Sequence, residues 1–64
     1  MKPYQQRVVD EKAELNSKLD KLNAFFPTDL FAQLKPNEQE RLYLQASVMQ
    51  KYSNILGERI EDFV

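Results

Sequence analysis

The 64-residue sequence contains no cysteine, no histidine and no tryptophan, and it has a single glycine. Without cysteine, neither a disulfide nor a thiolate metal site can stabilise a chain this short. Without histidine, the commonest metal ligand and the commonest general base are missing. One glycine cannot build a glycine-rich phosphate loop. These absences predict a binding protein that is not an enzyme and has no metal and no cofactor.

The charges nearly balance, with nine Lys and Arg residues against ten Asp and Glu residues. Proteins that bind long DNA or RNA normally carry a clear basic excess, so we expect no long nucleic acid as a partner. No apolar run approaches the roughly 20 residues that span a bilayer. The first residues also lack the apolar core of a secretion signal. We therefore expect no membrane contact and an intracellular location.

The spacing of apolar residues predicts two long helices joined by a short one. A helix over residues 4–25 follows Pro3, which suits the first turn of a helix. Pro27 and Pro36 interrupt the pattern and leave room for an elbow helix over residues 29–34. The last helix covers residues 38–62, with Asn37 as its expected cap. Each long helix carries one stripe of small and apolar side chains. The stripe of the first helix is formed by Val8, Leu15, Leu19, Leu22 and Phe26. The stripe of the last helix is formed by Leu42, Ala46, Met49, Ser53, Leu56, Ile60 and Phe63.

This pattern predicts an all-α fold: a single domain, residues 1–64, in which a long helical hairpin is closed by the elbow. We expect the three large apolar residues of the elbow, Leu30, Phe31 and Leu34, to plug the closed end. So short a chain buries a small core. The last helix also has a second apolar stripe, which includes Val48, and this surface exceeds what one partner helix would cover. Both points predict that the hairpin oligomerises through helix packing.

Gly57 has two interpretations, because a glycine inside a helix costs about 1 kcal/mol relative to alanine. It either ends the last helix or stays helical where another backbone comes close. Ile60 and Phe63 continue the apolar register beyond it, which favours the helical interpretation.

Four residues of the first helix suit a small phosphorylated ligand. Tyr4 can stack on a base, Arg7 can fork onto a phosphate, and Lys18 and Lys21 can act as point charges. Along one helix Tyr4 and Lys18 are about 21 Å apart, so they cannot touch the same small ligand within one chain. Two subunits packed antiparallel would bring Tyr4 beside the Lys18 of the other copy. The alternative interpretation is a packed helix end for Tyr4 and Arg7 and a solvated face for the two lysines.

The pattern as a whole resembles the helical-hairpin domain of phage anti-defence sponges, which include proteins that blunt CBASS immunity and proteins that blunt Thoeris immunity. The resemblance spans nearly the whole chain. It rests on residues 4–15, 18–22, Phe25, 31–34, 38–42, Gln45, Met49, Tyr52, 55–56 and 59–60.

This resemblance implies a protein that sequesters cyclic oligonucleotide immune signals without cleaving them, in the cytoplasm of an infected bacterium. The implied ligands are cyclic dinucleotides such as cGAMP and, in a second pocket type, cyclic trinucleotides. The implied assembly is a homo-oligomer, a dimer or hexamer with pockets between subunits. The family's ligand-contacting tyrosine and lysine match Tyr4 and Lys18, and Arg59 is the candidate for the second pocket. The chain is too short for the additional domain that binds a cyclised ADP-ribose in other members.

A second hypothesis is a small helical adaptor that binds a host or phage protein. The surplus apolar stripe would then dock a helix of that protein.

Overall fold

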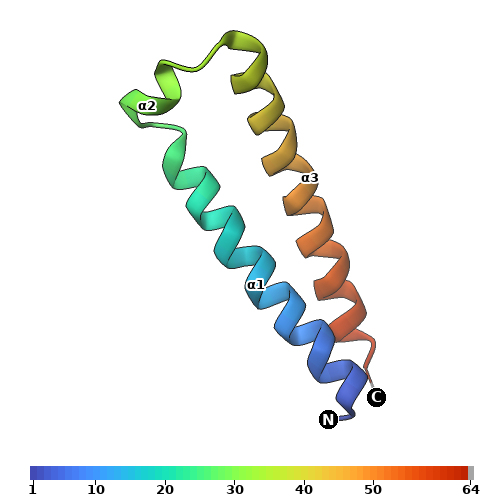
Figure 1. Cartoon of the computed structure of the whole chain (residues 1–64). Coiled ribbons are helices and arrows are strands. Elements are labelled where there is room, and N and C mark those ends of the chain that lie inside the picture. The colour runs from blue at the N-terminus through green and yellow to red at the C-terminus, as the bar shows by residue number, and fades with distance from the viewer. Residues whose placement is uncertain (64) are drawn as a thin grey trace.

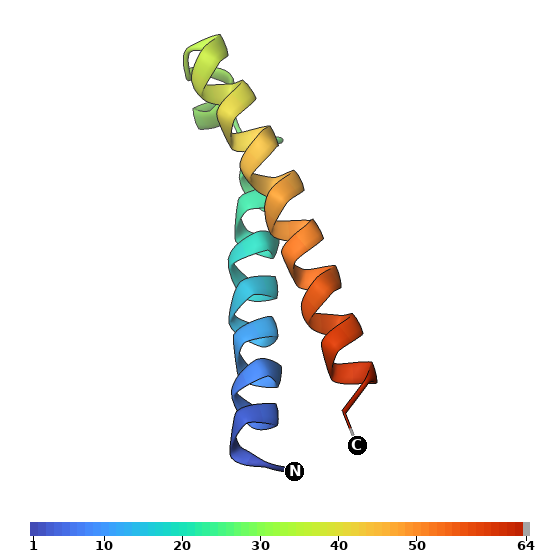
Figure 2. The same cartoon turned by 90° about the vertical axis from the view of Figure 1, so that its right-hand side faces the viewer.

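A computed structural model describes residues 1–63, which form a helical hairpin (Figure 1). Helix α1 spans Pro3–Phe25, the short α2 spans Asp29–Ala32 and α3 spans Pro36–Glu61. The long helices α1 and α3 run antiparallel side by side, so both termini lie at one end of the hairpin (Figures 1 and 2). The molecule measures 47 × 14 × 13 Å. The prediction of an all-α helical hairpin is confirmed.

The hairpin is far from spherical, and its core is correspondingly small. Its radius of gyration is 14.8 Å, whereas a compact domain of this length would have about 11 Å. Among residues 1–63, the buried apolar side chains are Val8, Leu19, Phe31 and Leu56. Each belongs to a predicted apolar stripe or to the elbow. Most other side chains of the described residues are at least partly exposed, so the hairpin has surface that another molecule could contact.

The helix boundaries differ from the predicted ones where proline is involved. Helix α3 begins at Pro36, with Lys35 at the N-cap position and, in the described chain, no capping side chain. The fixed backbone angle of proline suits the first helical position. The prediction that Asn37 caps this helix was therefore wrong, because Asn37 already lies inside the first turn. The elbow helix α2 ends at Ala32, two residues before the predicted end.

Polar side chains join the two long helices in the middle of their seam. The Lys12 Nζ donates to the Ser53 carbonyl oxygen at 2.7 Å and to the Ser53 Oγ at 3.0 Å. The Ser53 Oγ in turn donates to the Asn16 Oδ1 at 2.5 Å. Ser53 is buried, so these bonds satisfy a hydroxyl that would otherwise be costly to bury. They also specify which residues of α1 and α3 lie opposite each other.

Gly57 remains helical inside α3, as the apolar register indicated. The predicted reason was a neighbouring backbone, and this part was wrong. A Cβ built at Gly57 would lie 3.3 Å from the Lys12 Nζ and 3.7 Å from its Cε. The glycine therefore makes room for the lysine side chain that crosses the seam to Ser53.

Substituting Gly57 by Ala tests this explanation. Alanine gains about 1 kcal/mol of helix propensity, but its Cβ crowds a Lys12 ammonium that two hydrogen bonds hold in place. We expect the full gain in the free energy of unfolding only in a Lys12→Ala background, and a smaller gain with Lys12 present. Urea unfolding of the two single variants and the double variant measures this coupling. Equal gains in both backgrounds would show that Lys12 does not require the glycine.

Aromatic rings fill the closed end of the hairpin. Phe31 is only 4% exposed and makes edge-to-face contacts with Phe25, Phe26 and Tyr43, with ring centroids 5.2–5.7 Å apart. The Gln39 Nε2 donates to carbonyl oxygens of residues 31, 32 and 34 and so ties the end of the elbow to α3. The expectation that Leu30 also plugs this end was wrong, because Leu30 is 67% exposed.

Candidate functional site

The open end of the hairpin carries a pair of rings from opposite ends of the chain. Tyr4 and Phe63 meet edge to face with centroids 6.0 Å apart. The Tyr4 hydroxyl oxygen accepts a hydrogen bond from the Gln5 Nε2 at 3.5 Å, and the Gln5 Oε1 accepts one from the Lys2 backbone N–H at 3.0 Å. The Tyr4 ring is therefore supported from two sides, yet half of it remains exposed. A supported and accessible ring is a surface on which a base can stack.

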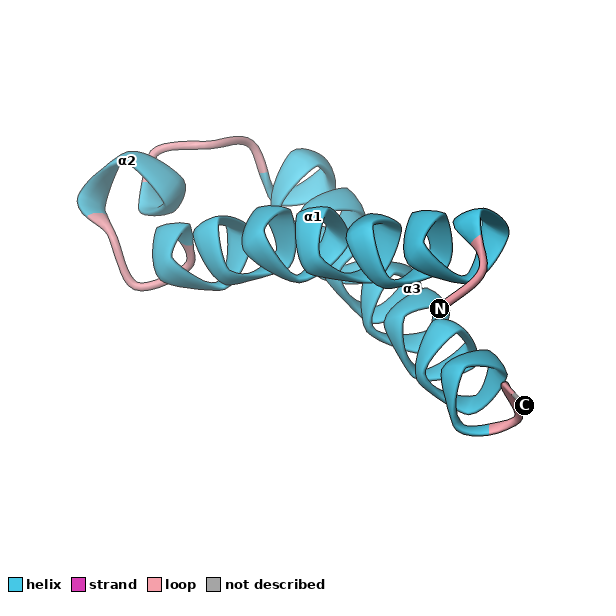
Figure 3. Cartoon of the chain, turned by 90° about the horizontal axis from the view of Figure 1, so that it is seen from below, coloured by secondary structure: helices cyan, strands magenta, loops and turns pink. Residues whose placement is uncertain are grey.

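Two arginines lie one helical turn from this ring pair. Arg7 follows Tyr4 on α1, and Arg59 precedes Phe63 at the end of α3. The start of α1 and the end of α3 lie at the same end of the hairpin (Figure 3). Arg7 and Arg59 belong to these two segments and therefore to that end. Both are exposed, and within residues 1–63 neither has an ion-pair partner. We call Tyr4, Phe63, Arg7 and Arg59 the open-end cluster.

Helical periodicity places Tyr4, Arg7 and Arg59 on the same flank of the hairpin, and Phe63 is placed by its contact with Tyr4. The Tyr52 hydroxyl donates to the Glu11 Oε2, and this bond, with the contact between Tyr4 and Phe63, identifies the flanks of α1 and α3 that face the same way. At about 100° per residue, Arg7 is about 60° from Tyr4 around α1, and Arg59 is about 20° from Tyr52 around α3. The cluster therefore combines one exposed ring with two guanidinium groups on one flank.

The structure does not bring Lys18 and Lys21 to this cluster. Both are exposed on α1, and Lys18 is about 21 Å from Tyr4 along the helix axis. Glu11 and Glu14 lie between Arg7 and Lys18 in the chain, and the Glu11 carboxylate is already engaged with Tyr52. A single chain therefore offers two separate groups of cations. The ligand-binding roles of Tyr4, Arg7, Lys18, Lys21 and Arg59 stay predictions.

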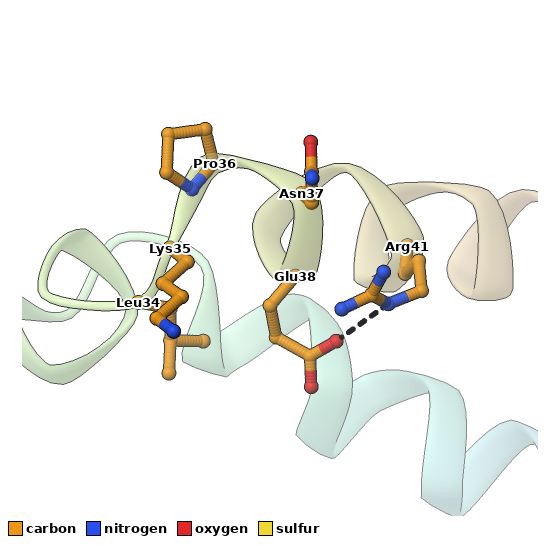
Figure 4. Close-up of a pocket in the computed structure, with 6 residues that line it drawn as sticks. All are labelled: Leu34, Lys35, Pro36, Asn37, Glu38 and Arg41. Atoms are coloured by element: carbon orange, nitrogen blue, oxygen red, sulfur yellow. Dashed lines mark hydrogen bonds and ion pairs between the residues drawn. The ribbon is translucent and has the colours of Figure 1, made fainter.

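A hollow of about 650 Å³ lies at the other end of the hairpin, where the elbow meets α3 (Figure 4). Its lining residues are Leu34, Lys35, Pro36, Asn37, Glu38 and Arg41. The Arg41 Nε pairs with the Glu38 Oε1 at 3.0 Å, so one of the two cations of the hollow is neutralised. This hollow could not be predicted from the spacing of apolar residues. The only signal for it was the Lys35-Pro36 pair, which predicts a chain reversal but not its shape.

The described residues contain neither a candidate metal-binding cluster nor a candidate membrane span. In residues 1–63, no three or more Asp, Glu, His or Cys side chains gather closely enough to bind a metal ion. None of the helices in that part of the chain combines the length and the apolar character needed to cross a bilayer.

Comparison with known proteins identifies the family. No curated protein and no solved structure is detectably similar to this chain. A family model described as Sequestin matches residues 2–62 and so covers all three helices and nearly the whole chain. The resemblance to phage sponges, which rested on residues of both long helices, is confirmed at the level of the family. The chain belongs to the Sequestin family, a sponge-type anti-defence family.

Proposed function

We propose that this protein is a non-enzymatic sponge for cyclic oligonucleotides, which it holds in the cytoplasm of an infected bacterium so that CBASS-type signalling fails. The observation that carries the proposal is the open-end cluster, in which a half-exposed tyrosine lies at the same end of the hairpin as two arginines without ion-pair partners in the described chain. A cyclic oligonucleotide presents bases and phosphates close together. This cluster offers a group for each.

Each residue of the cluster has a distinct role in this proposal. The Tyr4 ring stacks on a base, and the edge-on contact with Phe63 keeps that ring in place. The guanidinium of Arg7 forks onto a phosphate, because its planar donors match phosphate oxygens. Arg59 contributes a second cation from α3, either to the same ligand or to the second pocket type for cyclic trinucleotides.

Lys18 and Lys21 take part only if a second copy supplies them. A compact cyclic dinucleotide cannot reach across the roughly 21 Å between Tyr4 and Lys18 of one helix. If α1 helices of two copies pack antiparallel, Tyr4 of one copy lies beside Lys18 of the other. We therefore propose pockets between subunits of a dimer or hexamer. Closure by a second copy also removes solvent around the phosphates, which strengthens their attraction to the cations.

Sequestration requires tight binding, because a weak sponge leaves free signal for the immune sensor. Thermal unfolding with a panel of cyclic dinucleotides and trinucleotides tests this directly. A ligand that binds only the folded protein and is present at 100 times its Kd stabilises it by about 2.7 kcal/mol. We expect such a shift with at least one cyclic nucleotide, and none with the linear dinucleotide of the same bases.

Substitution of Tyr4 or Lys18 by Ala tests the residue assignment. Both side chains are exposed, so neither substitution is expected to disturb the hairpin core. We expect each variant to lose the nucleotide-induced shift while its native mass stays unchanged. Lys51→Ala, an exposed lysine on α3, is the matched control and should keep the shift. Retained binding in both the Tyr4 and the Lys18 variants would contradict the assignment.

The adaptor hypothesis remains a second candidate because one observation favours it. Val48 and Ile55 of α3 are 65% and 53% exposed, and an exposed apolar helix face is a common docking surface for another protein. Thermal unfolding with the nucleotide panel also distinguishes the two functions. No thermal shift with any cyclic nucleotide would favour the adaptor.

A further inference from the structure

Three polar side chains connect α1 and α3 in the middle of an otherwise apolar seam. The Lys12 ammonium donates to both oxygens of Ser53, and the Ser53 hydroxyl donates to the Asn16 side chain. We call Lys12, Asn16 and Ser53 the polar bridge. Ser53 is buried and the other two residues are half-buried. In the described part of the chain no carboxylate forms an ion pair with Lys12, and the adjacent Glu11 is bonded to Tyr52.

The apolar stripes alone do not determine how α3 lies along α1. Their side chains recur at about every turn, so a displacement by one turn, about 5.4 Å, again places apolar groups on apolar groups. The ring cluster fixes the closed end, where Tyr43 of α3 contacts Phe31 of the elbow. Phe63 at the open end follows Tyr43 by 20 residues, or about 30 Å of helix. The open end therefore needs a fixed point of its own, and Ser53 lies midway between the two rings.

Two features of α3 make the polar bridge specific for one alignment. Within the apolar stripe of α3, Ser53 is the one residue whose side chain carries a hydroxyl. One turn further, Gly57 is the only glycine of the chain, and the Lys12 Nζ lies 3.3 Å from where its Cβ would be. After a displacement by one turn, Lys12 would face Met49 or Leu56. Backbone carbonyls recur at every turn, but the hydroxyl and the gap do not, so other alignments leave the ammonium among apolar groups.

We propose that the polar bridge positions the open-end cluster, and that this is its main contribution rather than stability. The rings of Tyr4 and Phe63 have centroids 6.0 Å apart, so a displacement of about 5.4 Å would separate them. The same displacement would move Arg59 of α3 by one turn relative to Arg7 of α1. The role rests on the proposed function, since the cluster is the surface that presents one ring and two cations to the ligand.

This role predicts that stability and alignment respond differently when the bridge is removed. Burial of an ammonium and a hydroxyl is costly, and their hydrogen bonds offset that cost only in part. Apolar side chains of similar volume in such places are often neutral or stabilising, but they no longer distinguish one alignment from the next. A bridge that served stability alone would instead lower the resistance to urea when it is removed.

A bridge-free variant, Lys12→Met/Asn16→Leu/Ser53→Val, is the first test. We expect its urea midpoint to equal or exceed that of the parent protein. We also expect it to lose at least about half of the nuclear Overhauser effect between the Tyr4 and Phe63 rings, because two alignments of similar energy then share the population. Retention of the full effect would overturn the proposal. A lower midpoint, or a variant that does not fold, would overturn it as well, since the bridge would then serve stability.

Ser53→Thr and Ser53→Val form a matched pair for the hydroxyl. The two side chains have nearly the same shape and the same branching at Cβ, but only threonine carries a hydroxyl. Any strain from the added groups is therefore common to both variants. We expect Ser53→Thr to keep the ring contact and Ser53→Val to lose part of it. Equal Overhauser effects in the two variants would show that the hydroxyl does not select the alignment.

Nucleotide binding should follow the alignment. If only the aligned fraction binds, the apparent Kd rises as the inverse of that fraction. For the cyclic nucleotide of the thermal panel that the parent protein binds most tightly, we expect the Kd and the ring contact to give the same fraction in all three variants. An unchanged Kd with a lost ring contact would overturn the positioning role. A parent protein that binds no cyclic nucleotide would refute the proposed function instead, and the ring contact would still show whether the bridge selects the alignment.

Discussion

Phe31→Ala is expected to lower the free energy of unfolding by about 3–5 kcal/mol, as large-to-small substitutions of buried phenylalanines do. Phe31 is 4% exposed and contacts three other rings at the closed end. Its loss leaves a cavity among Phe25, Phe26 and Tyr43 that a two-helix hairpin has few atoms to refill. Because small domains are only marginally stable, an effect of this size rivals the whole stability of the protein.

Leu30→Ala is the matched control, since Leu30 is the sequence neighbour of Phe31 and lies on the same short helix. It is 67% exposed, so we expect a change within about 0.5 kcal/mol. Urea unfolding followed by circular dichroism measures both variants. Similar losses for the two substitutions would show that the rings do not hold the elbow to the long helices.

Arg7→Glu is expected to weaken cyclic nucleotide binding at least about 100-fold, if the proposed function is correct. A hydrogen bond to a charged group contributes about 1.5–3 kcal/mol, and each 1.4 kcal/mol is a factor of ten in affinity. Reversal of the charge removes the bond and adds repulsion toward the phosphate. Isothermal titration of the best ligand from the thermal panel gives the ratio of the two Kd values.

Lys35→Glu provides the control for Arg7→Glu, because it makes the same kind of reversal at the elbow hollow, at the opposite end of the hairpin. We expect the Kd of this variant to stay within a factor of about three, since exposed charges far from the ligand are screened. If Lys35→Glu abolishes binding and Arg7→Glu does not, the hollow at the elbow is the binding site and the open-end cluster is not.

The two long helices could be predicted from sequence because each carries an apolar stripe with helical spacing. The same periodicity does not say which residue of α1 lies opposite which residue of α3, because sliding by one turn keeps both stripes in contact. In the structure, the hydrogen bonds of Lys12 and Asn16 to Ser53 specify the alignment. The contact between Tyr4 and Phe63 follows from that alignment, so the open-end cluster could not be predicted without it.

The errors at the elbow have a common cause. Residues near proline obey local backbone constraints that outweigh side-chain preference, so Pro36 and not Asn37 determines where α3 begins. The exposure of Leu30 depends on the direction in which a four-residue helix points, and hydrophobic spacing carries no information about that direction. Among the ligand candidates, spacing correctly indicated that Tyr4 and Lys18 are far apart in one chain. An antiparallel hairpin places Arg59 at the same end as Arg7, but the flank that each residue faces depends on how α1 and α3 are aligned.

The slender shape of the hairpin, 47 × 14 × 13 Å, bears on how such a protein competes with a signalling pathway. If the proposed function is correct, the protein captures its target without turnover and acts once per site, so it must accumulate in numbers comparable to those of the signal. A unit of 7.6 kDa with little interior keeps the mass translated per captured molecule low. Under the proposed function, sequestration then depends on how many such units accumulate as much as on affinity.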